Sequence, residues 1–270
     1  MLPTRALPLT IYYGERRFLL LAESFTLDRR HAPYRRLAAT LLIARHQPFT
    51  LELEGQAPIE ARAVLLAPKL LRRHLRAEQS EIAIFDFPMD GSDYQRLAQT
   101  LSQRPAQVLD ADLFAPLFPL LQQAAEGQLD AHRAALLHRL AAATINPGET
   151  LGGGGDTRVA ATLQRLASLP LEQVSLTALA QAERLSPSRL SHLFRAETGS
   201  TVSHYARWVA VWRAVNQWQQ GRTWTRIAQD AGFHDLAHLD HAFIEVFGLK
   251  PSAIFDPSRV ALHRLGEPET

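Results

Sequence analysis

The alternation of apolar and polar positions predicts strands in the first part of the chain. Apolar residues alternate with Thr and Glu over 49–53, and the alternation resumes over 59–63 after a turn-like stretch. A period of two places the apolar side chains of a strand on one face, so this pair is expected to be a hairpin. A further strand-like run begins at Ile82 and ends at Pro88. Short strands with frequent turns favour a sandwich or a small barrel.

A helical period replaces this alternation after about residue 90. The apolar spacing over 94–101 predicts one amphipathic helix. Two more helices are predicted near 113–125 and 129–140, and the short turn at Gly127 between them predicts that they lie antiparallel. The pattern allows their apolar faces either to cover the barrel or to pair with a second copy of the chain.

Four consecutive glycines at 152–155 mark the domain boundary, because such a stretch has high backbone entropy and no side chains to pack. The organisation expected from the sequence has four parts. They are a sensor or dimerisation domain at 1–145, a linker at 146–156, a helical domain at 157–256 and a C-terminal tail at 257–270.

Two segments of the helical part, 48 positions apart, resemble each other: SLTALAQAERL from Ser175 and TWTRIAQDAGF from Thr223. Each predicts a short helix, a tight turn and a second helix, the helix-turn-helix pattern. The hydroxyls of Ser175, Ser186 and Thr223 precede apolar-periodic runs, where they can cap free N–H groups. Gly232 suits the turn of the second copy, whereas Arg184 in the first would be strained by a left-handed backbone.

One long helix is predicted between the two copies, over 201–219. At about 1.5 Å per residue it would span about 28 Å. Two recognition helices that enter successive major grooves are separated by about 34 Å. The tryptophans of this stretch, Trp208, Trp212 and Trp218, are interpreted as packing anchors rather than base-stacking platforms. Two matched motifs with a rigid spacer favour DNA binding over a generic helical repeat.

The stretch LSPSRLSHLFRAETG, followed by AGF and FGLKPSAI, resembles the C-terminal domain of AraC/XylS-type transcriptional regulators. The resemblance covers about 157–256. It implies two helix-turn-helix subdomains joined by a linker helix, and an N-terminal regulatory domain that is commonly a cupin-like barrel with dimerisation helices. The expected fold is therefore α+β: a cupin-like β-barrel with an antiparallel helical hairpin, then an all-α domain. The expected function is sequence-specific transcription regulation, as an activator or a repressor.

The predicted recognition helix of the first motif runs from Pro187 to Glu197. Its candidate DNA contacts lie opposite the apolar face: Ser188, Arg189, Ser191, His192 and Arg195. The two serines and His192 are expected at base-reading positions, because residues near the N-terminal end of such a helix reach base edges. The two arginines are expected on a base or a phosphate.

The second recognition helix, predicted over 235–247, carries the candidate contacts Leu236, Ala237, His238, Asp240 and His241. Acidic residues at 235, 240 and 245 would repel phosphate unless they are compensated, so this motif is expected to bind more weakly or to read fewer bases. His234 shares a helical face with His238 and His241, which is a spacing that zinc could use. DNA contact is favoured, since the family pattern often has a histidine at the position of His238.

Composition excludes several other classes. The chain has 270 residues and no cysteine, which rules out disulfide scaffolds and zinc fingers. Its formal net charge is only +2, so DNA contact must depend on local placement of charge. No apolar run approaches the ~20 residues of a membrane helix. We therefore expect a cytoplasmic protein with no membrane partner.

No motif for catalysis is present: the sequence lacks a G-x-S-x-G elbow, a P-loop and a G-x-G-x-x-G run. Metal-binding cupins typically show a paired His-x-His with a downstream carboxylate. Here His31, His46 and His74 are isolated from one another. The protein is therefore predicted not to be an enzyme, with no catalytic residue, no cofactor and no metal.

Two arginine clusters, at 29–36 and 72–76, support an alternative in which a small anion is sensed. The candidate ligand contacts are Arg30, His31, Arg72 and Arg76. If they converge at one barrel mouth they could clamp a carboxylate or a phosphate. The spacing from Arg72 to Arg76 is faintly similar to that of family members that bind cyclic dinucleotides.

The favoured interpretation of these arginines is a salt-bridged surface. An apolar effector inside the barrel fits the sequence equally well, as does no effector. Beyond double-stranded DNA, the candidate partners are RNA polymerase, a small-molecule effector and a second copy of the chain.

Overall fold

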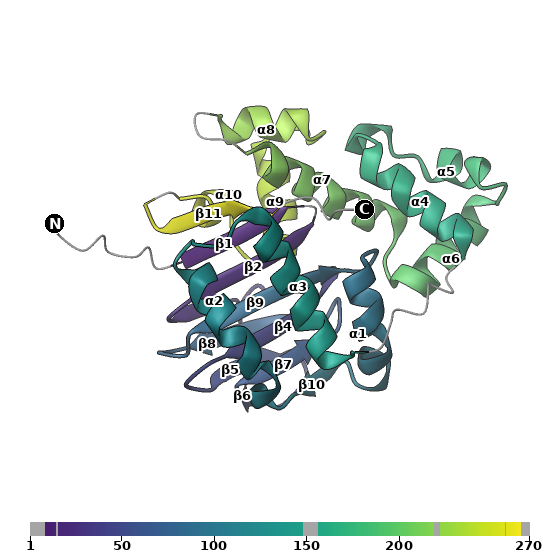
Figure 1. The fold of residues 1–270 in the computed structure, drawn as a ribbon. Coiled ribbons are helices and arrows are strands. Elements are labelled where there is room, and N and C mark those ends of the chain that lie inside the picture. The colour runs from purple at the N-terminus through teal and green to yellow at the C-terminus, as the bar shows by residue number, and fades with distance from the viewer. Residues whose placement is uncertain (1–8, 15, 148–155, 219–221, 257, 266–270) are drawn as a thin grey trace. The chain divides into compact units, whose positions relative to one another are not determined.

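The computed structural model describes residues 9–14, 16–147, 156–218, 222–256 and 258–265 (Figure 1). The chain forms two compact units. The β-rich unit comprises residues 1–149 together with 247–270, and the helical unit comprises residues 150–246. The glycine run at 152–155, on which the linker prediction rests, lies outside the described residues.

The β-rich unit contains two sheets, as the strand patterns predict. The larger sheet has the order β10 (Ala106–Val108), β7 (Ala63–Leu66), β4 (Ala38–Ala44), β9 (Ile82–Pro88), β2 (Arg17–Ala22), β1 (Leu9–Gly14) and β11 (Val260–Arg264). The smaller sheet has the order β3 (Phe25–Asp28), β8 (Arg72–Ala77), β5 (Phe49–Leu53) and β6 (Ile59–Ala61). The predicted hairpin is confirmed as β5 and β6, with Leu51 opposite Ile59.

Helices cover one face of the larger sheet (Figure 1). They are α1 (Ser92–Gln103), the 3₁₀ turn η1 (Ala111–Leu117), α2 (Phe118–Ala125) and α3 (Ala131–Ile145). Alternate strand residues such as Leu41 and Phe85 pack with these helices in one core cluster. Their neighbours Leu42 and Ile84 line the interior instead, together with Leu51 of the smaller sheet. The larger sheet is therefore buried on both faces, and the helices cover the β-structure.

The last described residues belong to the β-rich unit. Strand β11 pairs in parallel with β1, and the His263 ring stacks on Tyr12 with centroids 4.7 Å apart. Phe255 meets the Tyr13 ring edge-on at 5.6 Å. The predicted C-terminal tail at 257–270 therefore contains a strand, β11. The pairing covers β1, whose backbone N–H and C=O groups would otherwise form an open sheet edge.

The helical unit is built from α4 (Thr157–Ser168), the 3₁₀ turn η2 (Leu171–Gln173), α5 (Leu176–Ala182), α6 (Pro187–Thr198), α7 (Val202–Gln217), α8 (Trp224–Asp230) and α9 (Leu236–Phe247). The last residue of α9 and the short α10 (Pro251–Ile254) fall in the β-rich unit. Within the described residues, none of the helices combines the length and the apolar composition that a membrane span requires.

A chain of aromatic rings forms the centre of the helical unit. Phe194 of α6 meets Tyr205 at 5.6 Å, Tyr205 meets Trp208 at 5.3 Å, and Trp208 meets Trp212 at 6.5 Å. Trp208 and Trp212 are each only 2% exposed. Helix α7 is thus the long helix that the sequence predicts between the two motifs, and these two tryptophans pack in its core.

A charged cluster lies buried in the interior of the β-rich unit. Arg36 forms an ion pair with Asp86 of β9. The other Asp86 oxygen accepts a hydrogen bond from Thr40 Oγ1 at 2.6 Å, and Arg72 donates to the same Thr40 oxygen at 2.7 Å. All four side chains are buried. Burial lowers the pKa of Arg72, and the charge of Arg36 lowers it further. Two guanidinium groups therefore share one carboxylate.

We expect the substitution Asp86→Asn to destabilise the β-rich unit strongly. Removing the only carboxylate of a buried ionic cluster leaves uncompensated charge and costs about 3–5 kcal/mol. The matched control is Glu78→Gln, which removes the exposed partner of Arg76 and should cost about 1 kcal/mol or less. Urea unfolding measures both. Equal losses in the two variants would contradict the assigned role of Asp86.

The buried His138 is expected to make the stability of the β-rich unit depend on pH. Its ring lies against the Phe18 carbonyl at 3.1 Å and edge-on to Phe85 at 5.1 Å. Burial lowers the pKa of His138 to about 4, and the charge of Arg17 acts in the same direction. In the unfolded chain a histidine has a pKa of about 6.5. As the pH falls below that value, the unfolded chain takes up the proton first.

Stability is therefore lost between about pH 6.5 and pH 4, and the loss from pH 7 to pH 5 is about 2 kcal/mol from this group. The variant His138→Gln should lack this contribution. We would compare the urea unfolding free energies of the two proteins at both pH values. Parallel pH dependences would show that His138 is not the titrating group.

Candidate nucleic-acid interface

Each of the two helix-turn-helix motifs has the predicted caps. Ser175 Oγ accepts from the Ala178 N–H at 3.3 Å, and Ser186 Oγ accepts from the Arg189 N–H at 3.2 Å. Pro187 occupies the first turn of α6, which follows Ser186. In the second motif, Thr223 Oγ1 accepts from the Arg226 N–H at 3.3 Å. The cap of α9 is Asp235, whose Oδ1 accepts from the His238 N–H at 2.7 Å.

The turn inside each motif has the same backbone hydrogen bonds. The equivalent pairs are Leu185 N to Ala180 O at 2.8 Å, and Phe233 N to Ala228 O at 2.9 Å. Both turns pass through a left-handed residue, Arg184 with φ 55° and Gly232 with φ 86°. Gly232 also lies close to η2, since a Cβ there would lie 3.0 Å from the Leu171 nitrogen. The sequence repeat is therefore a structural repeat, and Arg184 takes the strained conformation.

Helix α6 turns its candidate DNA contacts outward. Leu190 and Phe194 are buried on its inner face. On the other face, Ser191 is half-buried. The other four candidates are exposed: Ser188, Arg189, His192 and Arg195. Among the described residues, neither arginine of this face forms an ion pair. Positive charge on this face is therefore available to a ligand.

Helix α9 presents a different surface. Ala237, His238 and His241 are exposed, while Leu236 and Asp240 are half-buried. The candidate contacts of the second motif are thus accessible, but this face carries no arginine.

The acidic groups that were expected to repel phosphate have structural partners. Asp235 caps the helix and contacts His234 Nδ1 at 3.2 Å. The hydrogen bond from the His238 N–H lowers the pKa of Asp235, as does His234. Glu245 pairs with Arg207 at 3.3 Å.

Arg226 in α8 and Arg222, which precedes this helix, also form ion pairs. Arg222 and Arg226 both contact Asp230. Of the two recognition helices, α6 is therefore the one whose arginines form no ion pair with a described residue, although the charge of Arg189 contributes to the lowered pKa of Asp156. The zinc alternative finds no support, because no group of three or more His, Cys, Asp or Glu side chains in the described parts of the chain is placed to hold a metal.

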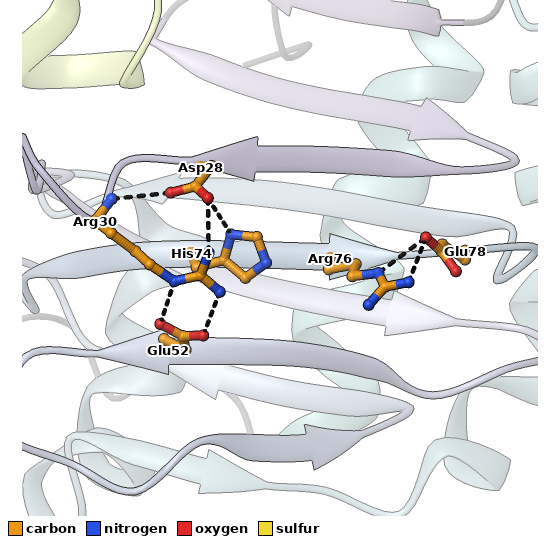
Figure 2. A network of polar contacts seen from close by, with 6 residues as sticks. All are labelled: Asp28, Arg30, Glu52, His74, Arg76 and Glu78. Carbon is orange, nitrogen blue, oxygen red and sulfur yellow. Dashed lines mark hydrogen bonds and ion pairs between the residues drawn. The ribbon is translucent and has the colours of Figure 1, made fainter.

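The N-terminal arginines do not converge. Figure 2 shows Arg30 held between two carboxylates, with Glu52 at 2.6 Å and 3.0 Å and Asp28 at 2.7 Å. Arg76 pairs with Glu78 at 2.8 Å (Figure 2). His31 is exposed. Arg30, Arg73 and Arg76 are thus salt-bridged, in agreement with the favoured interpretation for these three arginines.

An irregularity in β8 gives Arg72 and Arg76, which were predicted to bind a ligand together, opposite orientations. Glu52 lies opposite His74 but Leu53 lies opposite Arg72, so the strand gains one residue between the two pairs. Such a bulge reverses the direction of the side chains that follow it. Arg72 is therefore 4% exposed and lines the interior, whereas Arg76 is exposed. The predicted clamp by Arg72 and Arg76 does not form.

Tyr34 and Arg36 line the same small interior cavity as Arg72. Tyr34 was not predicted, and Arg36 was part of the 29–36 arginine cluster without being a predicted ligand contact. Its volume is about 10 Å³, close to the space that one water needs. The Nε atoms of Arg36 and Arg72 are buried without a hydrogen-bond partner among the described residues. Membership of the 29–36 cluster was the sequence signal for Arg36, but the sequence alone gives no indication that its side chain is buried.

We expect Arg184→Gly to stabilise the helical unit. A non-glycine residue in the left-handed region costs about 1–2 kcal/mol, part of which is offset by the greater unfolded-state entropy of glycine. The expected net gain is about 0.5–1 kcal/mol. The converse control, Gly232→Ala, should destabilise. Thermal unfolding measures both, and a lower melting temperature for Arg184→Gly would contradict the strain.

Comparison with known proteins agrees with this geometry. Residues 179–256 match a family model described as a helix-turn-helix domain. No curated protein sequence matches the chain. Among solved structures, ToxT from Vibrio cholerae O395 is similar, with 10% identity over 89% of this chain and 97% of that chain, and a TM-score of 0.54.

Two structures from Vibrio cholerae strain SCE256 are similar as well. An apo ToxT variant has a TM-score of 0.58 at 10% identity, over 90% of this chain and 97% of that chain. Wild-type ToxT bound to an unsaturated fatty acid has a TM-score of 0.54 at 11% identity, over 87% and 94%. These similarities show a shared α+β fold. The C-terminal region of the chain is an AraC-type helix-turn-helix domain, and this domain supports a DNA-binding transcription regulator rather than an enzyme.

Proposed function

We propose that the protein binds an asymmetric duplex site through two major-groove insertions, and that α6 makes most of the base contacts. The observation that carries this proposal is the outward face of α6, where Arg189, His192 and Arg195 are exposed. The capped N-terminus of α6 adds partial positive charge at the end that approaches a phosphate backbone. On this basis Ser188 and Ser191 lie where base edges are read.

Helix α9 has the supporting role in this proposal. Its candidate contacts are Leu236, Ala237, His238, Asp240 and His241. Neutral histidine and small apolar groups can contact bases, but they supply little of the phosphate attraction that dominates affinity. The charges around α9 are engaged within the protein, which supports weaker binding by the second motif.

We also propose that the β-rich unit senses a small acidic effector. ToxT, which shares the fold, has been solved with an unsaturated fatty acid. In the present chain, the interior cluster holds two guanidinium groups and one carboxylate, and two of its buried N–H groups lack acceptors. A carboxylate head would complete this cluster if the cavity, which has room for about one water, widens to admit it. The interior therefore suits an anion better than the surface arginines do, and cyclic-dinucleotide binding at Arg72 and Arg76 is not favoured.

Reciprocal coupling is a required property of this proposal: an effector that changes DNA affinity must itself be bound differently in the presence of DNA. A homodimer and a contact with RNA polymerase remain predictions for the β-rich unit and for the promoter complex. Binding to promoter DNA favours a cytoplasmic location.

The first experiment is selection from a pool of random duplexes with the purified chain, followed by sequencing. We expect one strongly enriched sequence block from α6 and a weaker block about one helical turn, ~10 base pairs, away. Fluorescence anisotropy on the selected duplex then tests single residues. Arg189→Ala and His192→Ala should each weaken binding about tenfold. His241→Ala should weaken it about threefold or less.

Arg133→Ala, in the β-rich unit, is the control for the loss of one positive charge and should leave binding unchanged. If Arg189 contacts phosphate, its removal should also reduce the salt dependence of binding by about one ion. Unchanged affinity in all three recognition-helix variants on the selected duplex would refute the assigned recognition surface.

A further inference from the structure

A second and larger cavity lies on the β-rich unit, between α2 and the ends of neighbouring strands. Its volume is about 450 Å³. We call it the α2 cleft. It is lined by residues of β1, β2, β9 and α2, and by the residues that flank β4 and β9. None of the predicted DNA contacts or ligand contacts lines it. Ligand pockets typically measure about 300–1,000 Å³, so the α2 cleft has the capacity of a small-molecule site.

The walls of the α2 cleft are apolar. Leu21 and Ile82 come from neighbouring strands of the larger sheet, and Phe118 and Leu121 come from α2. Thr10 also faces the cleft, but its hydroxyl donates to the Ala125 carbonyl at 2.8 Å and is thereby satisfied. The apolar side chains of the cleft therefore offer dispersion contacts rather than hydrogen bonds to a ligand.

The rim of the α2 cleft is acidic. Three carboxylates and one guanidinium line it: Glu23, Glu81, Glu126 and Arg45. Arg45 is committed to Glu81 at 3.1 Å, and its guanidinium also lies 5.9 Å from the Phe118 ring centroid. This pair closes one side of the rim without leaving a free positive charge.

The other two carboxylates have no cationic partner among the described residues. Glu126 accepts hydrogen bonds only from the amides of Gln122 at 3.2 Å and Gln128 at 2.8 Å. Glu23 forms no ion pair in the described part of the chain, although its backbone carbonyl accepts from residues 80 and 81. Glu126 also caps the C-terminal end of α2, where helix carbonyls add partial negative charge. The rim thus carries uncompensated negative charge beside an apolar interior.

We propose that the α2 cleft binds an amphiphilic organic cation, with a protonated amine at Glu23 and Glu126 and an apolar body against Leu21, Ile82 and Leu121. An organic anion of the same shape would meet two uncompensated carboxylates. A neutral apolar ligand would cover these carboxylates without replacing the water that solvates them. An amphiphilic cation is the ligand class that can both contact the apolar walls and neutralise the carboxylates of the rim.

Calorimetric titration of the full chain with octylamine and with octanoate tests the proposal, since the two probes share a chain length and differ in the sign of the head group. We expect saturable binding of one octylamine in the α2 cleft and no binding of octanoate there; octanoate bound at the interior arginines would belong to the separate carboxylate site. Glu23→Gln should weaken octylamine binding about fivefold, as expected for loss of one partly exposed ion pair. Glu60→Gln, an exposed carboxylate on β6 outside the cleft, is the matched control and should change nothing.

A second variant tests the cavity itself. Ala125 is exposed and lines the cleft, so Ala125→Trp should fill the cleft while the backbone carbonyl stays available to Thr10. We expect a loss of octylamine affinity of about tenfold or more through steric exclusion. Octanoate binding that Ala125→Trp removes, no binding of octylamine, or octylamine binding unchanged in both Glu23→Gln and Ala125→Trp would overturn the proposal. The titration needs no DNA, so its result is independent of the proposed regulatory function.

Discussion

The buried pair of Arg36 and Asp86 is the constraint on which the β-rich unit depends. Asp86 lies in β9, at the centre of the larger sheet, directly opposite Thr40 of β4. Its neighbours Phe85 and Phe87 face the opposite way, into the core under the helices. A slip of one residue in either strand would move the carboxylate into that apolar layer and leave two arginines unpaired. The ion pair therefore fixes register, and through Arg72 of β8 it also ties the smaller sheet to the larger one.

In the helical unit, too, the partners of the charged side chains decide what each surface can bind. Both motifs use the same cap chemistry and the same turn hydrogen bonds, so their backbones are equivalent. They differ in how their charged groups are used. In the second motif, Asp235, Glu245 and the arginines before and within α8 are engaged with one another or with the backbone. In the first motif, the arginines of α6 have no such partners in the described chain. One fold repeated twice thus offers two surfaces of different affinity for a polyanion.

The β-rich unit contains two environments of opposite charge. Its interior holds an excess of guanidinium groups, while the rim of the α2 cleft holds an excess of carboxylates. A carboxylate effector and an organic cation would therefore bind at different places in the same unit, without any change of fold. The first and last described strands, β1 and β11, meet in this same unit. Regulation by either ligand would require a measurable reciprocal effect between ligand affinity and DNA affinity.

The sequence by itself determined the features that depend on residues a few positions apart. Caps at Ser175, Ser186 and Thr223, the repeated turn and the hairpin β5–β6 all follow from local hydrogen bonding and periodicity. The tertiary structure decided which charges are free. Arg30 is neutralised by a carboxylate 22 positions away, and Arg36 by one 50 positions away. One extra residue in β8 sends Arg72 inward and Arg76 outward, and β11 pairs with a strand at the other end of the chain. These outcomes depend on long-range register and burial, for which a local pattern contains no signal.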